Sequence, residues 1–302
     1  VPHHHTNHGI ALRHLGRADE AEASFLRDAC GAARYSPRVS ESLVVNEIYL
    51  SLQGESTFAG LPCVFVRLTA CNLRCSYCDT AYAFTEGTRR PLEEIVAEVE
   101  RVAAPFRDSR SAFRLPLVEL TGGEPLLQPN ALPLMARLCD AGFTVLLETS
   151  GALDIARVDP RVRRIMDLKC PSSGEVERNR WENLAHLKAT DEIKFVIGTV
   201  QDYEWAKEQI IQHQLATRCP LLCSWVTPLQ PHQRNPVLKP VPPGQTLITR
   251  LELVERIIAD ALPPVLASVL QPEQLELMRR QLHQLPEPPA RPTLTKRDWI
   301  GA

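Results

Sequence analysis

The chain has 302 residues, of which 44% are hydrophobic and 23% charged, the composition of a globular protein with ample length for a buried core. A net charge of −2 provides no basic surface for a nucleic-acid backbone. The longest apolar runs are too short to cross a bilayer, and no signal-peptide pattern is present. We therefore expect a cytoplasmic protein with neither a nucleic-acid nor a membrane partner.

The N-terminal segment 1–42 has a different residue pattern from the rest of the chain. Alanine and apolar residues recur there at helical spacing, as in one helix of a tetratricopeptide repeat, and no second copy follows. A single repeat cannot bury its own apolar face. This segment is therefore expected to be a helical extension that need not belong to the fold.

From residue 43 to 227 the pattern alternates between strands and helices. Runs rich in Val, Ile and Leu predict strands at Val44–Leu50, Cys63–Leu68, Leu117–Leu120, Thr144–Glu148, Arg164–Leu168, Glu192–Ile197 and Leu221–Val226. Helical spacing predicts helices at Leu92–Ala103, Ala131–Ala141, Trp181–Lys188 and Tyr203–Gln214. Such alternation predicts an α/β fold with a parallel sheet, open or rolled into a barrel, whose site lies at the carboxyl ends of the strands.

The last region, 228–302, is different again. Pro228–Gly244 is dense in proline and reads as an extended loop. Thr249–Ala261 and Pro272–Leu285 are amphipathic and predict two helices, followed by a tail. We therefore expect three parts: the N-terminal extension, a core over 43–227 and this proline-rich region.

The nine cysteines are unevenly distributed. Four lie singly in apolar or mixed surroundings and are expected to act as small hydrophobic residues: Cys30, Cys63, Cys139 and Cys170. Cys219 and Cys223 are secondary candidates for a ligand role. The other three crowd into Cys71-Asn-Leu-Arg-Cys75-Ser-Tyr-Cys78, just past a predicted strand.

This C-x3-C-x2-C spacing predicts a four-iron cluster held by three thiolates, with one iron left open for another ligand. A zinc site and chance clustering are the alternatives. A structural zinc ion needs four ligands, and no fourth Cys or His follows at a suitable spacing. The three-cysteine pattern, with Tyr77 before its last member, resembles the signature of the radical S-adenosylmethionine superfamily.

Two further segments support and narrow the resemblance. Thr121-Gly-Gly-Glu-Pro125 directly follows a predicted strand and is similar to the superfamily segment that holds the methionine amino group. Glu47-Ile-Tyr-Leu-Ser-Leu-Gln-Gly-Glu55 precedes the cysteines, and Asp79-Thr80 follows them. Over about residues 44 to 226, the chain resembles the 7-carboxy-7-deazaguanine synthases.

The resemblance implies a partial parallel (β/α) barrel of the radical S-adenosylmethionine type, with an N-terminal helical extension and a divergent C-terminal region. It also implies an enzyme of queuosine and deazapurine biosynthesis, a carbon–nitrogen lyase that converts 6-carboxy-5,6,7,8-tetrahydropterin to 7-carboxy-7-deazaguanine and releases ammonia. The implied cofactors are a 4Fe-4S cluster, S-adenosylmethionine and Mg²⁺. The implied partners are the pterin substrate, an electron donor such as flavodoxin or ferredoxin, and a second copy in a homodimer.

Site residues follow from matching positions in the motifs. Cys71, Cys75 and Cys78 match the cluster ligands, and Thr80 matches a magnesium ligand. The positions that match substrate contacts are Leu52, Gln53, Gly54, Arg67 and Thr121. Those that match contacts to S-adenosylmethionine are Tyr77, Cys78, Asp79, Gly123, Asp167, Leu168 and Lys169. No protein side chain is assigned as a catalytic acid or base, although Glu148 is a further strand-end carboxylate with either a site role or a capping role.

Two departures from the family leave alternatives open. Family members end with a strand containing a His-Lys pair that closes on the substrate, and Ala261–Pro272 has no such pair. The extension over 1–42 is also foreign to the family. The alternatives are another radical enzyme, such as a protein-radical activase, an inactive copy with an open pocket, or a scaffold that uses the N-terminal helix.

Overall fold

The computed structural model describes residues 41–106, 116–226 and 236–261. The chain forms two compact units, Val1–Leu247 and Ile248–Ala302, and the sheet belongs to the first. The N-terminal extension, the helix expected at Pro272–Leu285 and the divergent segment expected to affect closure of the pocket lie outside the described residues. No helix among the described residues is long and apolar enough to span a membrane.

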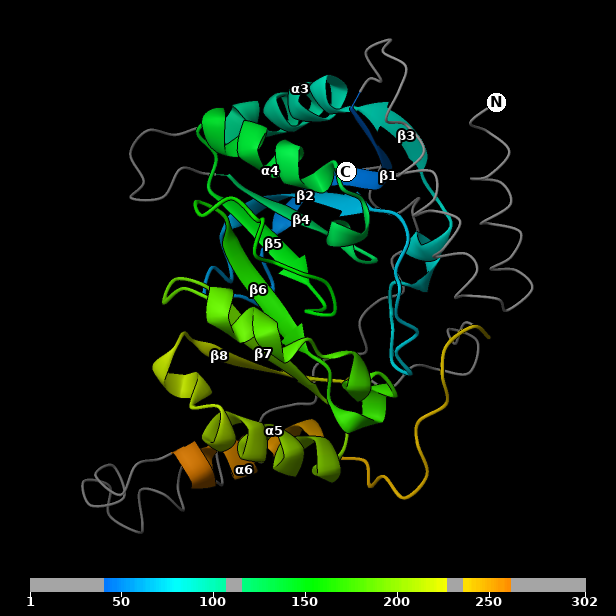
Figure 1. The fold of residues 1–302 in the computed structure, drawn as a ribbon, viewed down its shortest axis with the longest axis vertical. Coiled ribbons are helices and arrows are strands. Elements are labelled where there is room, and N and C mark those ends of the chain that lie inside the picture. Colours follow the sequence, from blue (N-terminus) through cyan, green and yellow to red (C-terminus); the bar gives the residue numbers. More distant parts are fainter. Residues whose placement is uncertain (1–40, 107–115, 227–235, 262–302) are drawn as a thin grey trace. The chain divides into compact units, whose positions relative to one another are not determined.

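The first unit is built on one eight-stranded sheet with the order β3-β1-β2-β4-β5-β6-β7-β8 (Figure 1). Its strands are β1 (Ser42–Leu52), β2 (Pro62–Leu68), β3 (Thr88–Pro91), β4 (Leu117–Gly122), β5 (Val145–Thr149), β6 (Arg163–Leu168), β7 (Glu192–Ile197) and β8 (Leu221–Trp225). Strands β2 and β4 to β8 are parallel to one another, which confirms the α/β class. The strand order has two ends, so the sheet is a partial barrel and not a closed one.

The edge formed by β1 and β3 is antiparallel, which the alternation of elements did not predict. Only residues 53–61 join β1 to β2, fewer than the dozen or so that a parallel crossover requires. Strand β3 is an unforeseen edge strand. Its Arg89, Arg90 and Pro91 are typical of edge strands, where charged residues and proline prevent pairing with a further strand. The same residue types are common in loops, so the local sequence does not identify a strand.

Three helices of this unit lie against the sheet: α3 (Leu92–Ala103), α4 (Ala131–Asp140) and α5 (Val200–Gln212). Figure 1 shows α3 and α4 near the β1–β4 part of the sheet and α5 near β7. Helix α5 begins at Val200, earlier than expected. Thr199 and Asp202 form a capping box there, in which each side chain accepts a hydrogen bond from the other residue's backbone N–H.

Another expectation is met only in part. Residues Trp181–His186 form a 3-10 helix instead of an α-helix. The buried side chain of Asn183 donates to the carbonyls of Gly151 and Leu153 there, which ties this turn to a loop far away in the sequence. In the second unit, α6 (Arg250–Ala261) matches the predicted helix.

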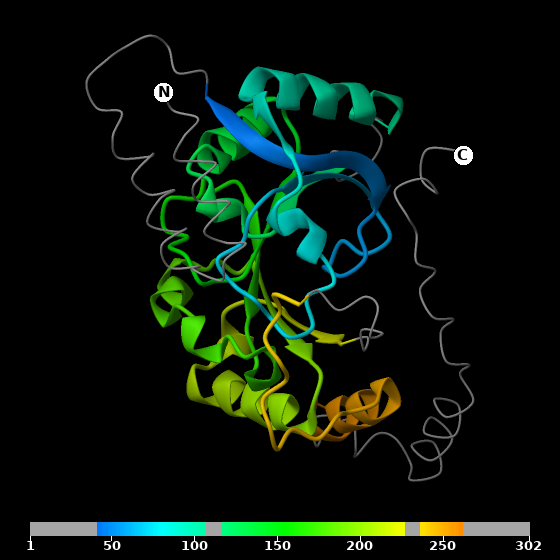
Figure 2. The same ribbon diagram turned by 90° about the vertical axis from the view of Figure 1, so that its right-hand side faces the viewer.

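The inner face of the sheet changes from apolar to polar along the strands. Near their amino ends, the face is filled by Cys63, Leu117, Leu146 and Ile165, packed with Phe58. Two or four residues further along the same faces stand Arg67, Thr121, Glu148 and Asp167. A polar layer therefore lies at the carboxyl ends of the parallel strands. Figure 2 shows these strands from the side.

Candidate active site

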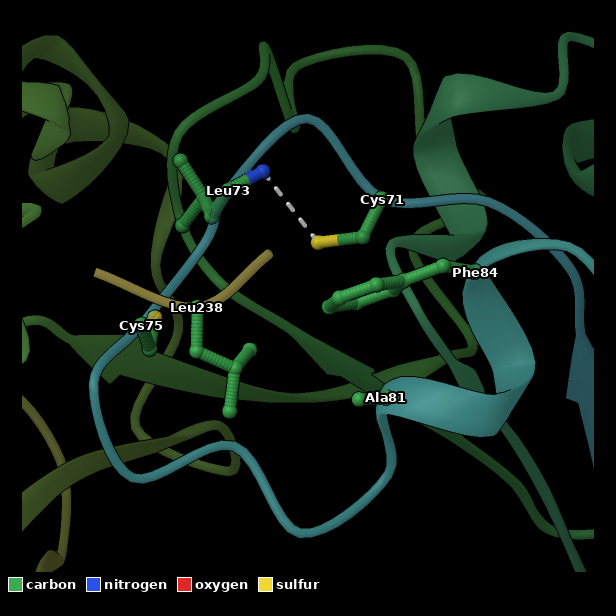
Figure 3. Packing of buried hydrophobic residues seen from close by; sticks show 6 residues of the cluster. All are labelled: Cys71, Leu73, Cys75, Ala81, Phe84 and Leu238. Atoms are coloured by element: carbon green, nitrogen blue, oxygen red, sulfur yellow. Dashed lines mark hydrogen bonds between the residues drawn. The ribbon is translucent and has the colours of Figure 1, made fainter. Parts of the chain in front are cut away.

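The three-cysteine loop begins directly after β2, at the carboxyl end of the sheet. Cys71 and Cys75 are buried with Leu73, Ala81 and Phe84, and Leu238 joins them from a segment far away in the sequence (Figure 3). Cys78 is partly buried against the same cluster. The backbone N–H of Leu73 donates to the Cys71 sulfur at 3.4 Å. The structure therefore brings the three predicted ligands into one apolar shell.

Burial controls the charge state of these thiols. It raises the pKa of Cys71 to about 12 and that of Cys75 to about 11, and it raises the pKa of Cys78 as well. The positive charge of Lys169 acts in the opposite direction on all three. The apo site thus holds protonated thiols at neutral pH, and iron has to displace their protons when it binds.

The loop and the end of β6 carry polar atoms that suit a bound polar group. Asn72 has both amide atoms buried, and Tyr77 and Asp167 each have one buried oxygen, without a partner among the residues described. Buried polar atoms normally have partners, so these fit the walls of a ligand site. No group of three His, Cys, Asp or Glu side chains in the described ranges is placed to hold a single metal ion. A four-iron cluster makes a different demand, since each thiolate binds its own iron.

The two glycines of the Thr121–Pro125 segment allow close contact with the cysteine loop. A Cβ at Gly122 would lie 2.2 Å from the carbonyl oxygen of Leu68, and Gly122 has a φ of +140°. A Cβ at Gly123 would lie 2.0 Å from the carbonyl oxygen of Ala70 and 2.9 Å from the Cβ of Cys71. The lack of a side chain at both positions therefore lets the backbone that leads into Cys71 approach closely.

Glu124 is fully buried and has four hydrogen-bond donors within its own chain. Its carboxylate accepts from the backbone N–H of Leu126 and of Ser150, and from the hydroxyls of Thr149 and Ser150, at 2.6–3.0 Å. Its role in this structure is to join the Gly-Gly turn to the end of β5.

A chain of charged side chains forms the polar layer inside the sheet. Lys194 of β7 is buried and donates to Glu148 of β5 and, at 3.0 Å, to Glu55. Thr121 of β4 donates its hydroxyl to the second oxygen of Glu148 at 2.9 Å. Burial raises the pKa of Glu148, but the charge of Lys194 outweighs it and holds that pKa below the ordinary range. Glu148 is therefore an anion, and its partners Lys194 and Thr121 lie on other strands of the sheet and not at a helix end.

Gln53 reaches the same interior from the loop after β1. It is buried, its amide nitrogen donates to Glu119 of β4, and its amide oxygen accepts from the backbone N–H of Glu55 at 3.0 Å. Burial, followed by the negative charge of Glu148, raises the pKa of Glu119 well above its usual range. Burial thus favours the neutral, protonated form of Glu119 beside the anionic Glu148, and such pairs mark acid–base positions in enzymes.

The raised pKa of Glu119 in the folded chain predicts that the effect of Glu119→Gln on stability depends on pH. The folded chain keeps the Glu119 proton to higher pH than the unfolded chain, so its stabilisation is complete below the unfolded pKa of about 4.3 and is lost as pH rises towards the folded value. The glutamine variant does not ionise. Its stability relative to wild type should therefore increase with pH above about 4.3, by up to about 1.4 kcal/mol per pH unit.

Urea unfolding between pH 5 and 8 measures this slope. The exposed Glu100→Gln change on α3 is the control and should give a flat difference. A flat difference for Glu119→Gln would show that Glu119 ionises normally.

Arg67 of β2 lies on the same face of its strand as Cys63, the inner face of the sheet, but it already has partners. Its Nε donates to Glu47 at 2.8 Å and its Nη2 to the Tyr49 hydroxyl at 3.0 Å. The guanidinium also lies 6.0 Å and 5.9 Å from the ring centres of Tyr49 and Tyr82. A substrate carboxylate would therefore share this arginine with Glu47.

The remaining predicted residues lie at both ends of the sheet, some near the cysteines and some far from them. The Thr80 hydroxyl donates to Asp79 at 2.8 Å, which puts two oxygen-bearing side chains directly after Cys78. Lys169 binds Asp167 at 2.7 Å at the end of β6, and Leu168 between them is fully buried. Leu52 and Gly54 are exposed and lie near the amino end of β2, at the opposite end from the cysteines.

The other cysteines match their expected role only in part. Cys63 and Cys170 are fully buried, Cys139 is partly exposed, and Cys30 lies outside the described residues. Cys219 is buried and Cys223 exposed.

Sequence reasoning missed four members of the interior: Glu55, Glu119, Lys194 and, near Arg67, Tyr49. Lys194 carried a usable signal, since a lysine within the apolar strand Glu192–Ile197 needs a buried partner. Glu119 carried one too, because it lies two residues before Thr121 and therefore on the same face. Their contacts with Glu148 and Gln53 cross four separate strands and loops.

Comparisons with known proteins identify the family of this chain. Residues 66–172 match the family model of the radical SAM superfamily. The chain is 50% identical over 175 residues to a 7-carboxy-7-deazaguanine synthase from Koribacter versatilis, covering 58% of this chain and 73% of that protein. It is 44% identical over 183 residues to the enzyme of the same name from Chlorobaculum tepidum, covering 60% and 78%.

Among solved structures, QueE from Escherichia coli is similar with a TM-score of 0.46 and 23% identity, covering 63% of this chain and 99% of that one. The sequence identity to the two synthases, over most of their length, is the stronger finding. The chain belongs to the 7-carboxy-7-deazaguanine synthase family, within the radical SAM superfamily.

Proposed function

We propose that this chain converts 6-carboxy-5,6,7,8-tetrahydropterin to 7-carboxy-7-deazaguanine with release of ammonia, in queuosine and deazapurine biosynthesis. One observation carries the proposal. The three-cysteine loop and the charged interior formed by Thr121, Glu148 and Lys194 lie at the same carboxyl end of the sheet. Family membership supplies the reaction, and the relatives support it over a protein-radical activase.

In this proposal, Cys71, Cys75 and Cys78 hold the 4Fe-4S cluster. S-adenosylmethionine lies against Tyr77, Cys78, Asp79 and Gly123, and against Asp167, Leu168 and Lys169. When bound, the cluster and S-adenosylmethionine supply one-electron chemistry that removes a hydrogen atom from the substrate. The orphaned oxygens of Tyr77 and Asp167 support this placement, because both need a polar partner.

The chain's own side chains bind and orient the substrate. Leu52, Gln53, Gly54, Arg67 and Thr121 are the proposed contacts. Gln53 and Thr121 act through networks, since Gln53 is bonded to Glu119 and Thr121 to Glu148. Leu238 and Phe84 exclude water on the cysteine side. Glu119, whose raised pKa favours the protonated form, and anionic Glu148 offer the polar edge of a pterin a donor and an acceptor.

We further propose, from the family resemblance, that the protein is a cytoplasmic homodimer. It takes its electron from flavodoxin or ferredoxin, and it uses Mg²⁺ bound through Thr80.

Incubation of anaerobically reconstituted protein with the carboxy-tetrahydropterin, S-adenosylmethionine and a reductant tests the proposed reaction. Mass spectrometry should find 7-carboxy-7-deazaguanine, and an ammonia assay should find an equal amount of ammonia. Cleavage of S-adenosylmethionine without this product would point to another radical enzyme. An intact cluster without any cleavage would point to an inactive copy.

Arg67→Lys tests the substrate carboxylate contact. Lysine keeps the charge near Glu47 but cannot provide the planar fork of a guanidinium, so the substrate's KM should rise steeply. Loss of such a contact typically costs about 2–5 kcal/mol. Slow cleavage of S-adenosylmethionine without substrate should persist. Arg137→Lys, an exposed arginine paired with Glu41 and Glu93, is the control. A normal KM for Arg67→Lys would exclude the contact.

Thr80→Ala tests the magnesium ligand. Removal of the hydroxyl should weaken the stimulation of turnover by Mg²⁺ while iron content stays unchanged, since magnesium prefers oxygen ligands. Thr80→Ser keeps the hydroxyl and should restore the response. An unchanged magnesium response in Thr80→Ala would return this residue to a structural role.

A further inference from the structure

The cysteine loop is anchored by a buried carboxylate from outside the motif. Glu175 lies in the segment after β6 and is only 5% exposed. One of its oxygens accepts the backbone N–H of Arg74 at 2.6 Å, and the other binds Lys239 Nζ at 2.9 Å. Arg74 directly precedes Cys75, so this hydrogen bond fixes the backbone at the second cysteine.

The segment around Lys239 attaches to the same place from a second direction. The backbone N–H of Lys239 donates to the Arg74 carbonyl at 2.9 Å, and its Nζ donates to the Gly174 carbonyl at 2.8 Å. The neighbouring Leu238 is buried against Cys71 and Cys75 (Figure 3). Both backbone groups of Arg74 are therefore held, one by Glu175 and the other by Lys239.

The next turn of the loop is held in a similar way. Ser76 donates its hydroxyl to the Ser172 carbonyl at 2.6 Å and its backbone N–H to the Ser173 carbonyl at 3.0 Å. Ser172 is bonded in turn to Asp202 on α5. Cys75 thus stands between two fixed residues. Among these anchors, Glu175 is the charged side chain that binds a direct neighbour of Cys75, the backbone of Arg74.

We propose that Glu175 is a positioning residue for the cluster, which fixes Cys75 through the backbone of Arg74, and that Lys239 completes this anchor and balances its charge. The inference rests on the proposed cluster but not on the proposed substrate. It assigns a specific task to the proline-rich region after β8, since Leu238 and Lys239 cover the loop there.

The positioning role and the charge of Glu175 have different physical consequences, one for iron release and one for the reduction potential of the cluster. Loss of the buried charged hydrogen bond frees the loop, so iron should leave faster. Reduction adds negative charge to the cluster, and the negative charge of Glu175 opposes it, since that charge acts on Cys75. Removal of this charge should therefore make reduction easier, whereas removal of the Lys239 charge should make it harder.

The experiment compares four variants of the reconstituted full chain. Iron release to a chelator and the midpoint potential, followed by electron paramagnetic resonance, are measured for each. Glu175→Ala should release iron roughly tenfold or more faster than wild type, as expected for a lost charged hydrogen bond. Glu175→Gln keeps an acceptor for the Arg74 N–H, so it should retain iron and show a raised potential. Lys239→Met should show a lowered potential.

Glu192→Ala is the matched control, because this buried carboxylate accepts the Thr57 N–H at 3.1 Å at the amino end of β7. It should lower thermal stability without changing iron release. Glu175→Ala with wild-type iron release, or with release no faster than that of an equally destabilised Glu192→Ala, would overturn the positioning role. Potentials that shift in the same direction in Glu175→Gln and Lys239→Met would overturn the charge role. A wild-type protein that keeps its cluster but makes no deazaguanine would overturn the proposed function alone.

Discussion

Replacement of Cys75 with alanine is expected to remove the iron–sulfur cluster and all cleavage of S-adenosylmethionine. Wild-type protein should hold about four irons and four sulfides per chain, with three thiolates as ligands. In the variant, one iron loses its thiolate, and the apolar side chains of Leu73, Phe84 and Leu238 around it cannot act as ligands. Iron and sulfide analysis and the visible absorbance measure the loss.

Cys139→Ala is the control for this result. Cys139 is partly exposed near the end of α4 and is not a member of the cluster of buried residues around Cys71. Its replacement should leave iron content and absorbance unchanged. Full iron content in Cys75→Ala, or stoichiometric zinc in the wild-type protein, would contradict the assignment.

Replacement of Lys194 with methionine should cause the second large effect. Its ammonium group is 6% exposed and neutralises Glu148 and Glu55, which are 30% and 47% exposed. Removal of one member of a buried pair typically costs about 3–5 kcal/mol, and the partial exposure of both carboxylates reduces this to about 2–3 kcal/mol. The melting temperature should fall by roughly 3–6 °C for a chain of this size.

Turnover of the carboxy-tetrahydropterin should also stop, while the cluster stays bound, since Lys194 lies on β7 and the cysteines follow β2. Lys194→Arg keeps a cation and should recover most of the stability. Lys207→Met on α5 removes a partly exposed lysine and is the matched control. A Lys194→Met variant as stable as wild type would mean that Glu148 and Glu55 are not held by this charge.

Much of the fold could be predicted because local patterns decide it. The strand at Glu192–Ile197 and the helix at Leu92–Ala103 have the predicted bounds. The antiparallel edge could not be predicted from the alternation of strands and helices. The direction of β2 relative to β1 depends on the length of the loop between them, which is too short for a parallel crossover. Residues 181–186 were misread as an α-helix, since the contacts of Asn183 with a distant loop are not visible in local spacing.

The sequence by itself determined the chemistry of the cysteine loop. Cys71, Cys75 and Cys78 are close in sequence, so their spacing alone brings three thiolates into one loop, and Gly122 and Gly123 follow a recognisable strand. Because each of these motifs is a short continuous segment, the sequence alone also indicates the family.

Only the tertiary structure decided what surrounds that loop. Glu119, Glu148 and Lys194 become neighbours through the register of separate strands. Burial then raises the pKa of Glu119, whereas the charge of Lys194 overcomes burial at Glu148 and lowers its pKa. Glu175 and Lys239 meet at Arg74 from segments about a hundred residues or more away in the chain. Such contacts depend on three-dimensional packing, because burial and charge act through space and not along the sequence.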